Sequence, residues 1–332
     1  MAQTSESRPT VSVVIPAWSA ERHLPACLAG LARQVDPPSF EILVVDDASP
    51  DRTAEVAAGA TVIRHEHNRG AAAARNTGAR AARGEVLLFV DSDVVPEPGL
   101  LAGVAALFED TSVAAATGRY TAEPANPGRF ARYKARWTWH CWEQTGARTG
   151  RSSHLQGALA AVRADAFARV GGFDERYAGG NVEDYELSAR LRAEGVAIVF
   201  DDRLGGAHHF PGFRTVARNY WDRTRMWIRL APEQKAFSSG QANPRSAAAA
   251  VAALGGAATH AGSLLFPPLI VPALACDAAF LASTGGFLRY VAREDGLRFA
   301  AYAAGCHYAL SAVVGAAALS TPLGRGTRRG TP

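Results

Sequence analysis

The sequence predicts an α/β domain with a mostly parallel, Rossmann-like sheet and helices on both faces, followed by C-terminal transmembrane helices. Two observations lead to this fold class. Short apolar runs alternate with helical patterns in the first part of the chain, which is typical of a parallel sheet. Long uncharged stretches near the C-terminus have the composition of membrane spans. The chain has 332 residues, which allows one large domain or two modest ones.

Three apolar runs have the length and β-branched content of buried strands: Val11–Ile15, Glu41–Val45 and Glu85–Val90. The first two are separated by His23–Gln34, which has helical spacing. Between the second and third we expect a helix from Thr53, a strand at Thr61–Arg64 and an Ala-rich helix at Ala71–Arg83.

Acidic side chains follow two of the three predicted strands. Asp46 and Asp47 come after the second strand, and Asp91 and Asp93 come after the third. Because ligands of such sheets bind beyond the carboxyl ends of the strands, we expect these carboxylates to converge on one site. Two aspartates at this spacing suit Mg²⁺ or Mn²⁺ carrying a diphosphate, although two solvated loop acids are the simpler interpretation of the pair alone.

Two further groups have both a binding and a structural interpretation. Asp46 and Asp47 could accept hydrogen bonds from a base or ribose, or Asp47 could cap the helix that runs through Thr53. Arg75 lies between glycines in a small-residue helix. It could contact a phosphate or a base, or the segment could be an ordinary helix.

Composition and missing motifs exclude several classes of protein. The net charge is +4 and no dense basic tract occurs, so a nucleic-acid partner is not expected. No GxGxxG turn follows the first strand, which argues against a Rossmann dehydrogenase. The four cysteines are far apart and form no CxxC pair, which fits a reducing compartment.

Six segments occur in a distinctive order: VSVVIPAW, VVDDAS, NRGAAAARNTG, VDSD, GGFDE and EDYELSARLRAEG. This order closely resembles the family-2 glycosyltransferases, whose fold is the GT-A fold. The resemblance covers about residues 10–210. It implies inverting transfer of a sugar from a nucleotide-diphosphate donor, linked to UDP, GDP or dTDP, with Mn²⁺ or Mg²⁺ as cofactor.

The resemblance also implies a role for each matching residue. The nucleotide-sugar site would contain Pro16, Asp46, Asp47, Arg75, Asp91 and Ser92. The metal would be held by Asp93 and Asp91, with His208 or His209 as a third ligand. Asp184 would be the general base, with Glu183 beside it. The acceptor side would contain Gly172, Phe173, Asp174 and Arg190.

Two departures from the family pattern bear on the donor contacts. The first strand leads into Trp18-Ser19, where the family usually has Tyr-Asn. Ala48 stands where the family usually has glycine, so the turn after the second strand is not expected to be left-handed.

The C-terminal part predicts attachment to a membrane. Phe299–Gly324 carries no charge and is long enough for one span of about 20 residues. Ser246–Cys276 is also uncharged. The longer run 247–284 is too long for one span and marginal for two, and Pro267 and Pro268 break it, so it is expected to form two spans or one span with a re-entrant or interfacial piece. Arg325, Arg328 and Arg329 favour the cytoplasm. With both ends of the chain on that side the number of spans is even, so two spans are expected; three spans are the alternative if the two ends lie on opposite sides.

The expected organisation is a disordered N-terminus (1–9), a GT-A domain (10–212), an amphipathic helix and linker (213–245), a transmembrane region (246–322) and a basic tail (323–332). The Arg-rich helix 213–230 is predicted to lie in the membrane interface, with packing against a core as the alternative.

The start of the chain has no apolar segment of a secretory signal, so the catalytic domain is expected in the cytoplasm, at an inner or plasma membrane. The expected acceptor is a lipid-linked hydroxyl or phosphate. The alternatives are a soluble acceptor, or a membrane-anchored protein that binds nucleotide sugars without turnover.

Overall fold

The computed structural model describes residues 9–144, 150–152, 154–177, 182–230 and 243–321. The predicted disordered N-terminus, the linker before residue 243 and the basic tail lie largely or wholly outside these residues. The chain divides into two compact units, which are a catalytic unit of Met1–Asn126 with Gly146–His209 and a helical unit of Pro127–Thr145 with Phe210–Pro332.

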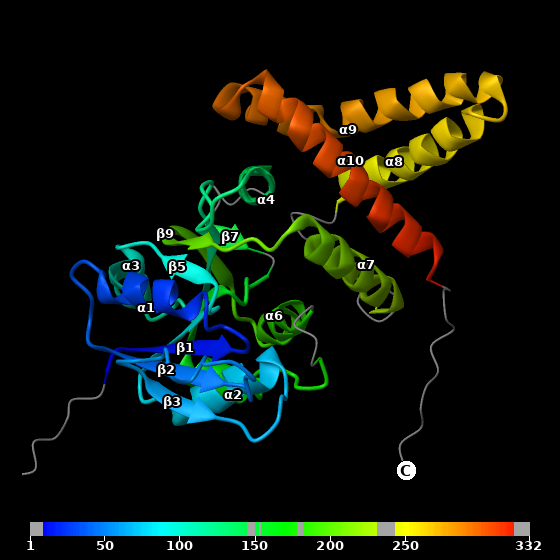
Figure 1. Cartoon of the computed structure of the whole chain (residues 1–332). Helices are drawn as coiled ribbons and strands as arrows, with labels where there is room; N and C mark the ends of the chain where they lie inside the picture. Colours follow the sequence, from blue (N-terminus) through cyan, green and yellow to red (C-terminus); the bar gives the residue numbers. More distant parts are fainter. Residues whose placement is uncertain (1–8, 145–149, 153, 178–181, 231–242, 322–332) are drawn as a thin grey trace, which may run out of the picture. The chain divides into compact units, whose positions relative to one another are not determined.

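The catalytic unit is built on one mixed sheet (Figure 1). The strands follow the order β3-β2-β1-β4-β8-β6-β9-β5, and β7 pairs with β9. Their bounds are β1 Val11–Ala17, β2 Phe40–Asp46, β3 Thr61–Arg64, β4 Val86–Val90, β5 Val94–Pro96, β6 Ala115–Tyr120, β7 Arg151–Ser152, β8 Leu159–Arg163 and β9 Ile198–His208. The pairs β3-β2, β2-β1 and β1-β4 are parallel, as predicted, while β8 is antiparallel to both β4 and β6.

Helices cover both faces of the sheet because successive strand residues point to opposite sides. Val13 and Ile15 of β1 belong to one apolar core with α1 and α3. Val14 of β1 and Phe89 of β4 belong to a second core with α2, α5 and α6. The bounds are α1 Leu24–Ala32, α2 Ala71–Ala81, α3 Leu100–Phe108, α5 Ala164–Arg169 and α6 Glu183–Ala193.

Two local predictions around β2 are wrong. The helix expected from Thr53 is absent, and residues 53–56 form a turn in which the Asp51 carboxylate accepts hydrogen bonds from the backbone and hydroxyl of Thr53. Such local bonds compete with helix formation. The turn after β2 is left-handed at Ala48, with φ of 58°. The Asp46 carboxylate holds this turn by accepting a hydrogen bond from the Ser49 amide at 2.9 Å.

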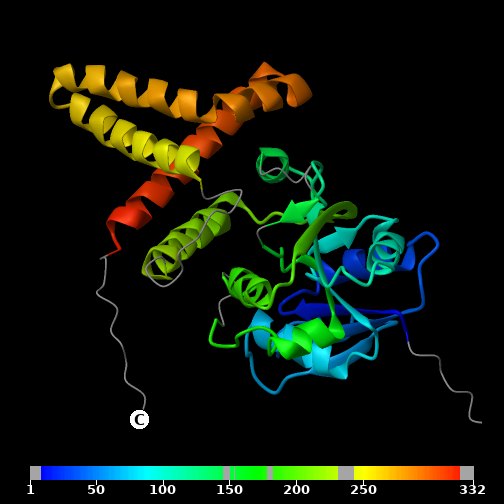
Figure 2. The same ribbon diagram turned by 180° about the vertical axis from the view of Figure 1, so that it is seen from behind.

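The helical unit contains α4 and the C-terminal helices (Figure 2). Their bounds are α4 Arg129–Gln144, α7 Phe213–Leu230, α8 Pro244–Ser263, a 3₁₀ turn η2 at Pro267–Leu269, α9 Ile270–Asp295 and α10 Leu297–Leu319. Tyr133 of α4, Phe287 and Val291 of α9, and Leu310 of α10 share one apolar core, which Val216 of α7 also joins. The predicted amphipathic helix 213–230 is therefore a helix, and its apolar side contributes to a core.

Two segments of the helical unit, among the described residues, are long and apolar enough to cross a membrane. They are Pro267–Asp295 and Leu297–Leu319. The uncharged stretch before Pro267 forms α8, whose composition is richer in alanine and glycine. The transmembrane prediction therefore has two candidate spans, and α8 is an additional long helix beside them.

Candidate active site

A cavity of about 470 Å³ opens at the carboxyl ends of β1, β2 and β4. Its lining residues are Pro16, Ala17, Trp18, Asp47, Asn68, Gly70, Ala71, Ala74, Arg75, Asp91, Ser92, Asp93 and Glu183. The strand ends predicted to converge do so, because parallel strands β2, β1 and β4 lie side by side and end at one edge. The volume lies in the range of small-molecule sites.

Arg75 joins the two acidic groups of this cavity. Its guanidinium donates to Asp91 Oδ1 at 2.7 Å and to Glu183 Oε1 at 3.0 Å. Arg75 and Glu183 are both buried. Burial raises the pKa of Asp91, and the positive charge of Arg75 opposes that rise. Arg75 therefore connects the end of β4 to the start of α6, and it neutralises carboxylates that would otherwise repel one another.

Asp184 follows Glu183 at the start of α6 and has a different environment. One carboxylate oxygen accepts a hydrogen bond from the Gly157 amide at 3.4 Å, and the other accepts from the Tyr185 amide at 2.9 Å. Burial and the adjacent Glu183 charge raise the pKa of Asp184 to about 7. A carboxylate with this pKa is suited to accept a proton near neutral pH.

Asp93 lies beside a group of histidines. Its Oδ2 is 3.3 Å from His208 Nε2, at the end of β9. The His209 ring packs against the His23 ring, with centroids 4.5 Å apart, and the His209 amide donates to the Asp93 carbonyl at 2.8 Å. Burial opposes ionisation of Asp93, but nearby His208 and His23 lower its pKa below the ordinary value. Of the two predicted histidines, His208 is the one in contact with the Asp93 carboxylate.

The predicted metal ligands fit a divalent cation that takes its remaining ligands from the substrate. Within the described ranges, no group of three or more His, Cys, Asp or Glu side chains is placed to hold a metal by itself. Asp93 and His208 supply an oxygen and a nitrogen, while Asp91 is paired with Arg75. Mg²⁺ and Mn²⁺ commonly take one or two protein ligands and several substrate phosphate oxygens. The donor set is therefore compatible with a diphosphate-bound cation.

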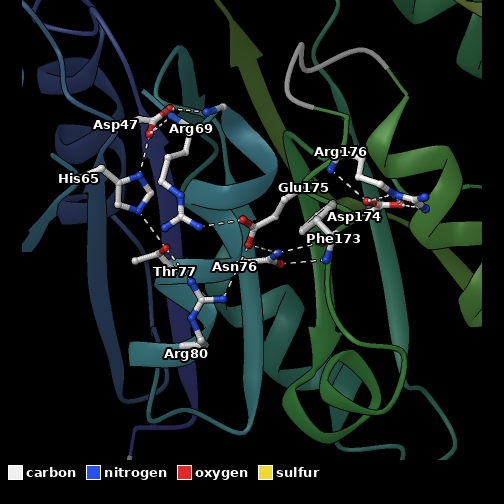
Figure 3. Close-up of polar contacts among 11 residues, drawn as sticks. Asp47, His65, Arg69, Asn76, Thr77, Arg80, Phe173, Asp174, Glu175 and Arg176 are labelled. Carbon is white, nitrogen blue, oxygen red and sulfur yellow. Dashed lines mark hydrogen bonds and ion pairs between the residues drawn. The ribbon is translucent and has the colours of Figure 1, made fainter. Parts of the chain in front are cut away.

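Asp47 lines the cavity, and it does not cap a helix at Thr53, because residues 53–56 form a turn. Its carboxylate accepts hydrogen bonds from the backbone amides of Arg69 and Gly70, at 2.9 and 2.7 Å, at the start of α2 (Figure 3). His65 Nδ1 lies 2.7 Å from the same carboxylate. Asp46 is fully buried, 3.4 Å from Arg64 Nη1, and does not line the cavity. Asp46 thus shapes the turn after β2, whereas Asp47 reaches the cavity.

The predicted acceptor-side residues are held by α2. The Asn76 carboxamide donates to the Phe173 carbonyl at 2.8 Å and accepts from the Phe173 amide at 2.9 Å, as Figure 3 shows. It also donates to Glu175 at 3.0 Å, and Glu175 pairs with Arg69 at 2.9 Å. Gly172 has φ of 72°, and an added Cβ would lie 2.7 Å from Asn76 Oδ1, so glycine is required there.

The other acceptor-side residues make local contacts. The Phe173 ring is buried and packs against Phe89, with ring centroids 5.2 Å apart. Asp174 pairs with Arg176, and Arg190 pairs with Glu186 on the same helix. None of these three side chains lines the cavity. These contacts indicate that the three residues maintain the conformation of the loop 171–175 and of α6.

Sequence reasoning missed three residues that contact predicted ones. They are His65, Asn76 and Gly157, which bond to Asp47, Phe173 and Asp184 respectively. Asn76 was available as a signal because it follows Arg75 directly in the NRGAAAARNTG segment. His65 and Gly157 are brought to the site by tertiary structure, and no local pattern marks them.

We expect Asn76→Leu to destabilise the loop 171–175, because it leaves the buried amide and carbonyl of Phe173 without partners. Each unpaired buried group costs about 1–3 kcal/mol. Urea denaturation should show a lower free energy of unfolding, and the acceptor KM should rise more than the donor KM. Arg80→Leu, on an exposed part of the same helix, removes only a 3.9 Å ion pair with Glu175 and is the comparison variant. Equal unfolding free energies of the two variants would contradict this role.

The chain is similar in sequence to known glycosyltransferases. Residues 12–171 match the family described as Glycosyl transferase family 2. Most of the matched residues lie within the catalytic unit, and together they make up just under half of the chain. A pre-mycofactocin glycosyltransferase of Mycobacterium tuberculosis is 32% identical over 253 residues, which cover 70% of this chain and 47% of the relative. A validoxylamine A glucosyltransferase of Streptomyces hygroscopicus subsp. limoneus is 30% identical over 238 residues, covering 57% and 49%. The chain spans about half the length of these relatives.

Among solved structures, a mannosyltransferase from Pyrobaculum calidifontis, in complex with GDP-Man and Mn²⁺, aligns with a TM-score of 0.57. It is 19% identical, and the alignment covers 95% of this chain and 87% of that protein. At this identity the likeness shows the fold. The GT-A fold predicted from the sequence is confirmed.

Proposed function

We propose that this protein transfers a sugar from a nucleotide-diphosphate donor to a lipid-linked acceptor, with inversion at the anomeric carbon and with a divalent cation. The observation that carries the proposal is the pair Glu183 and Asp184. Arg75 holds Glu183 in an ion pair, whereas burial raises the pKa of Asp184 to about 7. Glu183 lines the cavity, but Arg75 neutralises its charge, whereas Asp184 is not among the lining residues and is the carboxylate that we propose as the base.

The chemistry follows from these positions. Asp184 accepts the proton of the acceptor hydroxyl as its oxygen attacks the anomeric carbon, and the bond from that carbon to the diphosphate oxygen breaks. A single displacement inverts configuration and needs no carboxylate nucleophile, unlike retaining glycosidases. Asp93 and His208 would hold the cation, which neutralises the charge of the departing diphosphate. Arg75, Asp47 and Ser92 line the volume proposed for the nucleotide.

Different observations support the proposed donor and the proposed acceptor. The solved mannosyltransferase holds GDP-Man and Mn²⁺, which supports a nucleotide sugar and a divalent cation for this chain. The two long apolar segments of the helical unit support a membrane location. The cytoplasmic side is proposed for the catalytic unit because nucleotide sugars occur there. The proposed acceptor is a lipid-linked glycan, whose hydroxyl gives its proton to Asp184, or a polyprenyl phosphate, whose attacking oxygen gives up a proton only when the phosphate is a monoanion.

The test is turnover of UDP-, GDP- and dTDP-linked sugars by the purified full chain in lipid vesicles. Lipid-phosphate and water-soluble acceptors are compared, and nucleotide release and glycosylated product are both measured. Product from a lipid acceptor alone supports the proposal. Product only from a soluble acceptor contradicts the lipid part, and nucleotide binding without product contradicts the transferase part.

Asp93→Ala is expected to abolish transfer and to weaken Mn²⁺ binding in the presence of nucleoside diphosphate, because His208 alone is a poor site. Mn²⁺ binding is read by electron paramagnetic resonance, independently of activity. Asp201→Ala, which removes a partly exposed carboxylate paired with Arg203, is the matched control. Full activity of the parent in EDTA would contradict the proposed cation.

A further inference from the structure

Helices α8 and α9 form an antiparallel hairpin with an apolar tip. Figures 1 and 2 show the two helices side by side and joined at a short turn. We call residues 264–274 the hairpin tip. Its exposed large side chains are Leu264 (86%), Leu265 (92%), Phe266 (59%), Ile270 (43%), Val271 (69%) and Leu274 (58%). A water-facing turn rarely gathers so many large apolar side chains, because contiguous exposed apolar surface favours association.

A polar pair lies directly behind the tip. His260 Nε2 of α8 is 2.8 Å from Asp277 Oδ2 of α9. Between this pair and the open end of the hairpin, exposed positions are mostly alanine, such as Ala257, Ala258 and Ala278. Val251 and Leu281 are the large exposed exceptions among the described residues there. The strong apolar surface of the hairpin is therefore concentrated at the tip.

The open end of the hairpin is charged. Arg245 lies at the start of α8, and Arg293 lies in the last turn of α9. Asp295, at the end of α9, is 2.7 Å from Arg132 and 2.8 Å from Arg136 of α4. Helix α4 follows β6 of the catalytic unit after the short connection 121–128. We therefore infer that this end of the hairpin is on the same side of a membrane as the catalytic unit.

The charge-free segment at the start of α9 is short enough to lie within one leaflet of a bilayer. Seven residues separate Ile270 from Asp277, which is about 10 Å at 1.5 Å per residue. The hydrocarbon core of a bilayer is about 30 Å thick, so one leaflet supplies about half of that depth. If the hairpin crossed the membrane, its turn of leucine, phenylalanine and proline would emerge in water on the far side. No polar side chain occurs between Ser263 and Asp277 to face that water.

We propose that the hairpin tip inserts into one leaflet of a lipid bilayer, up to the His260–Asp277 pair, and does not cross the membrane. Both ends of the hairpin then stay on the side of the catalytic unit. The bilayer is the occupant because the tip is charge-free, fits within the depth of one leaflet and is followed by a polar pair that can reach the headgroups. This inference rests on the membrane part of the proposed function and specifies how that attachment is made.

The test uses single-cysteine probes in the full chain, reconstituted into vesicles of phosphatidylcholine and phosphatidylglycerol. Cys276 and Cys306 are first replaced by alanine, while the buried Cys27 and Cys141 are kept. The probes are Leu265→Cys at the tip, Val251→Cys behind the polar pair and Glu294→Cys at the open end. Each is treated with a membrane-impermeant maleimide from one side of the bilayer, from the other side, and after detergent.

We expect Leu265→Cys to be labelled at least tenfold more slowly from either side than in detergent. Val251→Cys and Glu294→Cys should be labelled from the catalytic side alone. Labelling of Leu265→Cys from the opposite side would show a crossing hairpin and overturn the proposal. Labelling of Leu265→Cys from the catalytic side, protection of Val251→Cys from both sides, or a disulfide between two Leu265→Cys chains would overturn it as well.

Nucleotide release by the same vesicles separates this inference from the proposed function. A protected tip in vesicles that release no nucleotide from any donor would count against the transferase function and leave the inserted tip supported. An accessible tip in vesicles that glycosylate a lipid acceptor would overturn the insertion and leave the function supported.

Discussion

Asp184→Asn should lower the rate of transfer at least about 100-fold and leave donor binding nearly unchanged. This is the scale of general-base catalysis, and asparagine cannot accept the proton of the acceptor hydroxyl. Donor binding is measured by calorimetry with the nucleotide and transfer by product formation. Asp165→Asn, an exposed carboxylate paired with Arg169, is the matched control. A loss of only a few-fold would point to another base, and Glu183→Gln would then be the next variant to measure.

The pH dependence of the parent should identify the same group. Burial and the Glu183 charge raise the pKa of Asp184 to about 7, and the base must be deprotonated to act. Transfer should therefore rise with pH up to about 7 and level off above it. Asp184→Asn should lose this slope along with most of the rate, whereas Asp165→Asn should keep the slope.

The raised pKa of Asp184 also predicts that the free energy of unfolding falls as pH rises, whereas the rate of transfer increases. The folded-state pKa of Asp184 lies above its ordinary value, so the folded state binds this proton more tightly than the unfolded chain does. The resulting stabilisation is present at low pH and is lost as pH rises through about 7. Relative to the parent, Asp184→Asn should gain unfolding free energy between pH 5 and pH 8. Parallel unfolding curves across this range would indicate an unshifted pKa.

The parts of the fold that local patterns specify were predictable from the sequence. The runs that became β1, β2 and β4 are short and apolar, and their alternation with helices defines the parallel part of the sheet. The acids at their ends, Asp47 and Asp91, could be placed at one edge because parallel strands end together.

Other features depend on contacts between distant residues and were not predictable. The pairing of Arg75 with both Asp91 and Glu183 joins positions 16 and 108 residues away along the chain. Ala48 adopts a left-handed φ although it is not glycine, because the Asp46 side chain holds the turn. The division of roles that we propose for Glu183 and Asp184 rests on the ion pair between Arg75 and Glu183, which adjacent positions in a sequence cannot reveal.

Arg75→Met should both destabilise the catalytic unit and remove activity. The variant leaves Asp91 and Glu183 without the cation that neutralises them, and breaking a buried ion pair by removing one partner costs about 3–5 kcal/mol. The free energy of unfolding, measured by urea denaturation, should fall by about this amount. Arg80→Met, on an exposed position of the same helix, should change it by less than about 1 kcal/mol.

A double variant distinguishes the electrostatic role of Arg75 from its packing. Arg75→Met with Glu183→Gln removes the charge of the buried carboxylate that was left unpaired, so it should regain part of the lost unfolding free energy. It should not regain transfer, because Arg75 also positions Asp91 at the cavity and lines the proposed nucleotide site. If the double variant were no more stable than Arg75→Met, the loss would come from packing of the long side chain. If it regained transfer, Arg75 would be a structural residue outside the donor site.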